Sequence, residues 1–446
     1  MLNTTPTPSP PSSAQLQTRS LETVWHPCTQ MKQHETYPLV PIVSGKGVWL
    51  YDAAGKRYLD SISSWWVNLF GHANPTINAA IRDQLEKIEH VMLAGFTHEP
   101  VVALSERLKT IAPGSLGHCF YASDGASAIE IALKMSFHYW LLCGQPQKNH
   151  FISLQNDYHG ETLGALSVTD VAIFKETYAP LLRPCTHVPT PDWRYAEPGE
   201  SAEAYALRAA AVLERHLADN HAQIAALILE PLVQGATGMG MYHPVYLQRA
   251  REICTRYQVH LIADEIAVGF GRTGTLFACN QADIAPDFLC LSKGLSGGYL
   301  PLSVVMTPDA IFQAFYDDKT ARAFLHSHSH TGNALACRAA LATLDIFERD
   351  QIIETNKTKA AYLNTIAAPL AAHPQVKNFR NCGMIWAFEV ETNDHDFAAK
   401  CFQAGLEQQL ILRPLGKTIY FMPPYIISEQ EMDLLVDGTL HVLNTL

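Results

Sequence analysis

The chain has 446 residues, of which 48% are hydrophobic and 17% charged, so we expect at least two lobes built around buried cores. Asp and Glu number 43 against 32 Lys and Arg, and the net charge of −11 argues against nucleic acid as a partner. The ten cysteines form no C-x-x-C pair and no apolar run is long enough to cross a bilayer, so we expect reduced thiols, a cytoplasmic protein and no membrane partner.

The first part of the chain changes character twice. Residues 1–20 are rich in Pro, Ser and Thr and lack an apolar segment, which predicts a disordered tail rather than a signal peptide. Residues 48–59 form two stretches around an Ala-Gly turn, which predicts a pair of short strands. Helical periodicity begins at about Asn74, so residues 21–75 are expected to form the N-terminal part of a small lobe.

Over residues 76–331 short apolar runs alternate with helical stretches. The runs are HCFYAS, HFISL, IAALILEP, VHLIADE, DFLCLSK and LPLSVVMT. Strands that are apolar throughout are buried on both faces, so this large domain is predicted to be α/β, with a mostly parallel central sheet flanked by helices. Residues 332–446 predict a helix, the strands MIWAFEV, LILRPLG and TIYFMPP, and a closing helix, which would complete a smaller α+β lobe from the two chain ends.

Lys293 stands directly after the apolar run DFLCLS and before a glycine-rich stretch. A lysine that is desolvated at a strand end can lose its proton and form a Schiff base with a carbonyl compound. The loops at the carboxyl ends of parallel strands also form the cleft in which ligands bind. Taken alone, Lys293 is better explained as a solvated surface lysine, because most lysines are solvated.

Asp264 ends another apolar run, VHLIAD. A pyridine nitrogen that must stay protonated needs a buried carboxylate partner, and this position would supply one. A helix cap or a salt bridge would also explain an Asp here, but neither predicts an Asp and a Lys at the ends of separate parallel strands. Lys293 and Asp264 together therefore predict pyridoxal 5'-phosphate as the cofactor.

Two further segments are candidates for holding that cofactor. Asp124 and Gly125 lie in a turn of small residues that follows HCFYA and opens a helix, where free N–H groups and the helix dipole attract phosphate. Tyr158 follows FISL and would stack on the cofactor ring. Without a cofactor, the same residues would be an ordinary capped helix start and a packing tyrosine.

Two more stretches of the sequence resemble ligand-binding motifs. Residues 269–274 match G-x-G-x-x-G, but no long helix pattern follows to receive a pyrophosphate, which argues against a nicotinamide oxidoreductase. His326, His328 and His330 would share one face of an extended segment. No carboxylate or cysteine joins them at a suitable spacing, so no metal site is expected.

With these residues in place, the chain resembles the class III aminotransferases, which are pyridoxal-phosphate enzymes of fold type I, from about Trp25 to the C-terminus. The family motifs are LILEP, IADEIAVGFGRTG, DFLCLSKGLSGG and TGN. Within the family, the stretches VWHPCTQM, SISSWWVNLFGH, HVMLAGFTHEP, YHGET and LRPLGKTIYFMPPYI resemble the branch that makes 7,8-diaminononanoate for biotin synthesis.

The resemblance implies a role in cofactor chemistry for each matching residue. Lys293 would hold the cofactor covalently and, once freed, move a proton between the substrate carbon and the cofactor. Asp264 would keep the ring nitrogen protonated, and Asp124 with Gly125 would cradle the phosphate. Tyr158 would stack on the ring and face the substrate.

The resemblance also implies a homodimer with its active sites at the subunit interface. His328 and Ser329 would reach the phosphate of the neighbouring subunit. Trp66 would line the channel for a long apolar acid, and Ser327 would contact that acid through its backbone. Arg413 would pair with the distal carboxylate, a task that suits a bidentate guanidinium.

The implied reaction transfers an amino group to 8-amino-7-oxononanoate, with S-adenosylmethionine as the donor. Arg272 is a secondary candidate for binding the donor's carboxylate, and Ala236, where many relatives carry a gating Glu, argues against glutamate. Cys28 and Glu161 depart from the branch pattern on the donor side, so lysine as donor stays open. Two different functions also stay open: an ω-aminotransferase for a diamine, ornithine or 4-aminobutyrate, and a non-catalytic binding protein with this fold.

Overall fold

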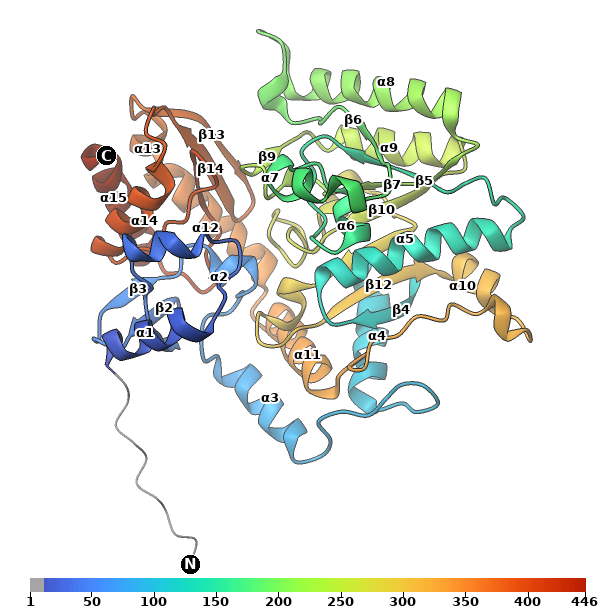
Figure 1. Cartoon of the computed structure of the whole chain (residues 1–446), viewed down its shortest axis with the longest axis horizontal. Coiled ribbons are helices and arrows are strands. Elements are labelled where there is room, and N and C mark those ends of the chain that lie inside the picture. Colours follow the sequence, from blue (N-terminus) through green and yellow to red (C-terminus); the bar gives the residue numbers. More distant parts are fainter. Residues whose placement is uncertain (1–11) are drawn as a thin grey trace, which may run out of the picture.

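The computed structural model describes residues 12–446 (Figure 1). The predicted disordered tail is wrong for its second half, because helix α1 occupies Ser13–Thr23. Ser12 begins this helix with a capping box: Gln15 N–H donates to Ser12 Oγ at 3.3 Å, and Ser12 N–H donates to Gln15 Oε1 at 3.0 Å. This start signal sits inside a Pro- and Ser-rich stretch whose composition concealed it. The first eleven residues of the expected tail lie outside the described part of the chain.

The central sheet has the strand order β4-β12-β11-β10-β7-β5-β6. β12 pairs antiparallel with both of its neighbours, and every pair from β11 to β6 is parallel. The predicted fold, α/β with a mostly parallel sheet, is confirmed. The strands are β4 (Leu116–Ala122), β5 (His150–Leu154), β6 (Thr186–Val188), β7 (Ile224–Leu229), β10 (His260–Asp264), β11 (Phe288–Leu291) and β12 (Ser303–Pro308).

Both faces of this sheet are covered, which explains why the interiors of its central strands are mostly apolar on both sides. Along β10, Leu261 and Ala263 belong to the larger buried cluster and Ile262 to a second cluster beneath helix α5. Figure 1 shows the surrounding helices from cyan to orange. They are α3 (Pro75–Leu85), α4 (Glu99–Ile111), α5 (Gly125–Leu142), α6 (Leu163–Val168), α7 (Ala172–Lys175), α8 (Ala202–Asn220), α9 (Val245–Arg256), α10 (Asp309–Phe315) and α11 (Ala334–Arg349).

The N-terminal segment of the described chain lies beside the C-terminal segment, as the blue and red parts of Figure 1 show. One antiparallel sheet comes from the N-terminal part and another from the C-terminal part, and Leu59 N–H donates to Gln409 O at 2.7 Å between them. The domain boundaries at 75/76 and 331/332 stay predictions. The elements are β1 (Ile42–Lys46), β2 (Trp49–Asp52), β3 (Arg57–Leu59), α12 (Ile352–Ile366), α13 (Ala368–Ala371), β13 (Val376–Cys382), β14 (Ile385–Val390), α14 (Phe397–Glu407), β15 (Thr418–Phe421) and α15 (Glu429–Thr445).

The strand predicted over LILRPLG is wrong. This stretch is irregular. Within it, only Leu410 and Leu415 form isolated β-bridges, and the chain turns at Gly416. Pro414 has no N–H to donate to a neighbouring strand, so a continuous ladder cannot form here. The irregular backbone leaves the adjacent Arg413 half-buried instead of packed within a sheet.

Over residues 12–446, no helix combines the length and the apolar composition that crossing a membrane requires.

Candidate active site

A cavity of about 480 Å³, called the inner cavity below, opens where β5, β7, β10 and β11 end. The structure brings most of the predicted site residues together here, since carboxyl ends of parallel strands meet at one edge of a sheet. The lining residues are Pro27, Cys28, Trp65, Trp66, Asp124, Gly125, Ala126, Tyr158, His159, Gly160, Glu161, Thr162, Glu230, Asp264, Ile266, Ala267 and Lys293.

Lys293 lies two residues beyond β11, at the start of a short 3-10 helix. Its φ of 44° places the backbone in the left-handed region, which costs a residue with a side chain roughly 1 kcal/mol. The Nζ atom lies 4.9 Å from the centroid of the Trp66 ring. Burial lowers the pKa of Lys293, although the Asp264 and Glu230 carboxyls oppose this effect. Burial therefore favours the neutral, nucleophilic amine.

Asp264 is held by a buried histidine. His159 Nδ1 lies 2.8 Å from Asp264 Oδ2, and its Nε2 lies 3.5 Å from Asp157 Oδ2. Burial alone would lower the pKa of His159, but the two carboxylates outweigh it and raise the pKa to about 10. The imidazole is thus a cation at neutral pH, and it lies beside the Asp264 carboxylate inside the protein.

The first turn of helix α5, which follows β4 along the chain, forms one end of the inner cavity. Asp124 is the N-cap: its carboxylate accepts from Ser127 N–H at 2.9 Å and from Ser127 Oγ–H at 2.8 Å. Gly125 allows the close approach of Ile266, because a Cβ at position 125 would lie 2.9 Å from Ile266 Cγ2. The N–H groups of Gly125 and Ala126 lie in the first turn, where helix N-termini bind anions.

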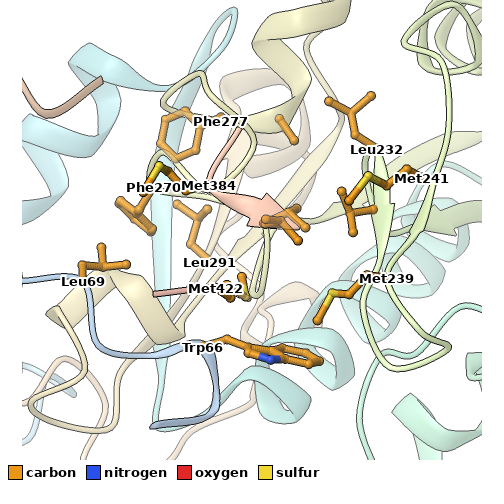
Figure 2. Packing of buried hydrophobic residues seen from close by; sticks show 14 of the residues in the cluster. Trp66, Leu69, Leu232, Met239, Met241, Phe270, Phe277, Leu291, Met384 and Met422 are labelled. Carbon is orange, nitrogen blue, oxygen red and sulfur yellow. The ribbon is translucent and has the colours of Figure 1, made fainter. Parts of the chain in front are cut away.

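Trp66 reaches the cavity from an unusual backbone turn. The four residues of α2 (Ser63–Trp66) all have positive φ, between 48° and 75°. Asp60 holds this turn, because its carboxylate accepts from Ser64 N–H at 2.8 Å and from Ser64 Oγ–H at 2.7 Å. Figure 2 shows Trp66 at one edge of the buried apolar cluster, with Met239 and Met422 among its labelled neighbours. The left-handed turn therefore anchors an apolar wall of the cavity.

Tyr158 is fixed at both its backbone and its hydroxyl. Its N–H donates to Glu230 Oε2 at 2.8 Å, and its Oη–H donates to Glu161 Oε1 at 2.9 Å. Burial and the Glu161 carboxylate raise the pKa of Tyr158 well above its usual value. The phenol remains protonated and offers the cavity a ring face rather than a charge.

A second, outer cavity of about 1110 Å³ shares Cys28 and Trp65 with the inner one. Arg413 lines it, with its guanidinium carbon 4.2 Å from the centroid of the Trp65 ring. Burial and Glu161 raise the pKa of Cys28, against the opposing effect of Arg413, so its sulfur is a thiol. Arg413 thus places a cation in the outer cavity, beyond the Trp65 side chain that lines both cavities.

Four further candidates from the sequence do not line the inner cavity. The Arg272 side chain is buried and donates to backbone carbonyls, among them Pro423 O at 2.8 Å and Asn68 O at 3.2 Å, so its role toward a donor stays a prediction. Ser327, His328 and Ser329 lie in the segment before α11, where His90 Nε2 lies 2.7 Å from Ser329 O. Their predicted roles, which for His328 and Ser329 are in a neighbouring subunit, stay predictions.

Two residues of the cavity were missed from the sequence. Glu230 follows the apolar strand β7 directly, which is the same signal that pointed to Asp264. His159 stands beside Tyr158, and no local pattern indicates that its ring turns toward a strand more than a hundred residues further along the chain. The first omission was avoidable, whereas the second needed the tertiary structure.

Comparisons with known proteins agree with this geometry. Residues 30–443 match the family described as aminotransferase class-III. An adenosylmethionine-8-amino-7-oxononanoate aminotransferase of Helicobacter pylori is 47% identical over 434 residues, covering 96% of this chain and 97% of the relative. The enzyme of the same name from Geobacter sulfurreducens is 39% identical, with 95% and 96% covered.

Two solved structures extend the likeness to three dimensions. The crystal structure of adenosylmethionine-8-amino-7-oxononanoate aminotransferase from Methanocaldococcus jannaschii superposes with a TM-score of 0.91 at 34% identity, covering 96% of this chain and 98% of that one. An omega transaminase from Pseudomonas jessenii in complex with PMP has a TM-score of 0.92 at 29% identity, with the same coverage.

Proposed function

The chain belongs to the class III aminotransferase family, and on this basis we propose that it transfers an amino group to 8-amino-7-oxononanoate, giving 7,8-diaminononanoate for biotin synthesis. The observation that carries the proposal is the meeting of Lys293 and Asp264 in one cavity, at the ends of separate strands. The names of the relatives from Helicobacter pylori and Geobacter sulfurreducens support the choice of substrate.

Family members depend on pyridoxal phosphate, and the inner cavity fits this group. The first turn of α5, with Asp124 and Gly125, suits the phosphate because it lines the cavity at a helix N-terminus. Asp264, which contacts His159, suits the protonated ring nitrogen, and Lys293 suits the carbonyl carbon. When bound, the cofactor accepts the amino group of the donor and passes it to the ketone carbon of the acceptor.

The chain's own residues then supply binding and proton transfer. The neutral Lys293 amine would take a proton from the substrate carbon that bears the amino group and deliver it to the reacting carbon of the cofactor. Tyr158, with a protonated phenol, covers the ring without adding charge. Trp66 walls the cavity beside Lys293 and excludes water from the proton in transfer.

The acceptor is a nine-carbon acid that carries its carboxylate far from the reacting ketone. Its apolar chain suits the wall formed by Trp65 and Trp66, and its carboxylate suits Arg413 beyond them. The guanidinium lies over the Trp65 ring, and its planar fork suits a bidentate pair with a carboxylate.

S-adenosylmethionine is the proposed donor, with lysine as the alternative. Cys28 and Glu161, the two positions that differ from the branch pattern, both line the inner cavity and so lie where a donor would bind. The likeness to omega transaminases of known structure keeps a broader amine specificity as the second candidate.

The active form is proposed to be a cytoplasmic homodimer. His328 and Ser329 would reach the partner's phosphate, and Ser327 would contact its acceptor acid through the backbone. Large apolar side chains near this segment are exposed in the single chain, including Phe96 at 56% and Leu325 at 76%, which supports a covered interface.

The first test is the visible absorption of the purified protein, followed on separate addition of S-adenosylmethionine, lysine and glutamate. A band that bleaches only with S-adenosylmethionine is the expected result. Bleaching with lysine instead would change the donor, and a protein that shows no band after addition of pyridoxal phosphate would overturn the proposal. The Lys293→Ala variant serves as the control, and it should give neither the band nor turnover.

A further inference from the structure

Glu230 is a buried carboxyl group in the wall of the inner cavity to which the reaction described above gives no task. It follows β7 directly, and only 3% of the residue is exposed. Its two oxygens accept from different backbone segments: Tyr158 N–H donates to Oε2 at 2.8 Å, and Gly235 N–H donates to Oε1 at 3.0 Å. One carboxyl group therefore joins the loop after β5 to the turn after β8 (Val233–Gln234).

These two segments support two walls around Lys293. Tyr158 contributes its own ring to the cavity. Gly235 supports Trp66, because a Cβ at position 235 would lie only 3.1 Å from the indole ring. Lys293 Nζ lies over that same ring. The position of Tyr158 relative to Trp66 thus depends on the two hydrogen bonds to Glu230.

The charges around Glu230 are unbalanced in the described residues. The carboxyls of Asp157 and Asp264 and the cation of His159 are its charged neighbours, and Lys293 is the remaining cation that lines the same cavity. Burial, reinforced by Asp157, raises the pKa of Glu230 to about 8. A second positive charge beside that of His159 favours the ionised carboxyl, and the Lys293 nitrogen can provide it when it holds the cofactor.

We propose that Glu230 is a positioning residue with a second, electrostatic task. It locks the Tyr158 loop to the Gly235 turn that packs against Trp66, and it favours a proton on the Lys293 nitrogen while that nitrogen holds the cofactor. This inference rests on the proposed function, because the nitrogen in question is the one that would hold the cofactor.

The test compares Glu230→Gln with a matched control. Gln removes the charge and one of the two acceptors at nearly constant volume. Glu265→Gln is the control, because Glu265 is also fully buried and accepts from two backbone N–H groups, of Ala278 at 2.7 Å and Cys279 at 2.8 Å, but does not line the cavity. Three quantities are measured: the pH midpoint of the cofactor's visible band, the affinity of the apoprotein for pyridoxal phosphate by tryptophan fluorescence, and kcat with KM.

The expected result for Glu230→Gln is a downward shift of the midpoint by about 1 pH unit, weaker cofactor binding and a kcat lowered at least about tenfold. Glu265→Gln should lower the melting temperature without moving the midpoint. A midpoint and kcat that both stay at the wild-type values in Glu230→Gln would overturn the inference. A wild-type protein without the band would instead overturn the proposed function, so the two failures are distinguishable.

Glu230→Asp decides the matter if the Gln variant fails to fold. It retains the charge but is one methylene shorter, so it cannot reach both N–H groups. Its midpoint should match that of the wild type while its kcat falls. A kcat at the wild-type level would show that the double hydrogen bond has no positioning role.

Discussion

His159 Nδ1 lies 2.8 Å from Asp264 Oδ2, and this contact joins the loop after β5 to the end of β10. Both side chains are almost fully buried. The pair places a fixed cation behind the carboxylate that is proposed to hold the cofactor's ring nitrogen. His159 therefore supports this carboxylate without needing to touch the ring itself.

His159→Gln tests this support. Gln can donate to Asp264 but carries no charge, so the carboxylate loses its neighbouring cation and should hold the ring nitrogen less firmly. We expect the dissociation constant of pyridoxal phosphate to rise at least about tenfold in a fluorescence titration. His187→Gln is the control, because His187 is half-buried nearby but contacts Ser153 and Lys175 instead of Asp264. Equal affinities in the two variants would contradict the assigned role.

The raised pKa of His159 also predicts how stability depends on pH. The pKa is about 10 in the folded protein, against 6.5 for an ordinary histidine, so folding favours the protonated form. This contribution is complete below pH 6.5 and is lost as the pH rises through about 10. The melting temperature of the wild-type apoprotein should therefore fall between pH 7 and 10 more steeply than that of His159→Gln. Parallel curves would contradict the prediction.

Arg413→Lys tests recognition of the distal carboxylate. Lys keeps the charge but loses both the planar stacking on Trp65 and the bidentate geometry. We expect KM for the acceptor to rise at least about tenfold with little change in kcat, because the contact is made equally in the ground and transition states. A methyl ester of the acceptor should bind equally weakly to both proteins. If the KM of Arg413→Lys for the free acid equals that of the wild type, the assignment of Arg413 to the carboxylate is contradicted.

Asp60→Ala tests the support of the left-handed turn that carries Trp66. The change removes the acceptors for Ser64 N–H and Oγ–H and the partner of His72 Nε2 at 3.0 Å, so the run of four residues with positive φ loses part of its support. Unfolding by urea should show a loss of about 2 kcal/mol, and kcat/KM should fall as the wall loosens. Asp83→Ala is the control, because its ion pair with Lys87 is exposed and should contribute little. An Asp60 variant as stable as this control would argue against the support.

Local pattern was sufficient for the elements whose signal is contained in a few neighbouring residues. The all-apolar runs of β7, β10 and β11 predicted a buried parallel sheet, because only strands covered on both faces can be apolar throughout. Local pattern predicted the wrong element where one residue outweighed the surrounding composition. The capping box at Ser12 was hidden by its composition, and Pro414 interrupts an otherwise apolar stretch.

The sequence by itself determined the α/β architecture, the strand-end positions of Lys293 and Asp264 and the helix start at Asp124, because periodicity and strand ends are properties of adjacent residues. Only the tertiary structure decided which distant groups share a low-dielectric site. The ion pair of His159 with Asp264, the bridge of Glu230 from Tyr158 to Gly235, and the withdrawal of Arg272 to backbone carbonyls are such cases. Their charge states follow from burial and from neighbours brought together by folding, which no spacing along the chain encodes.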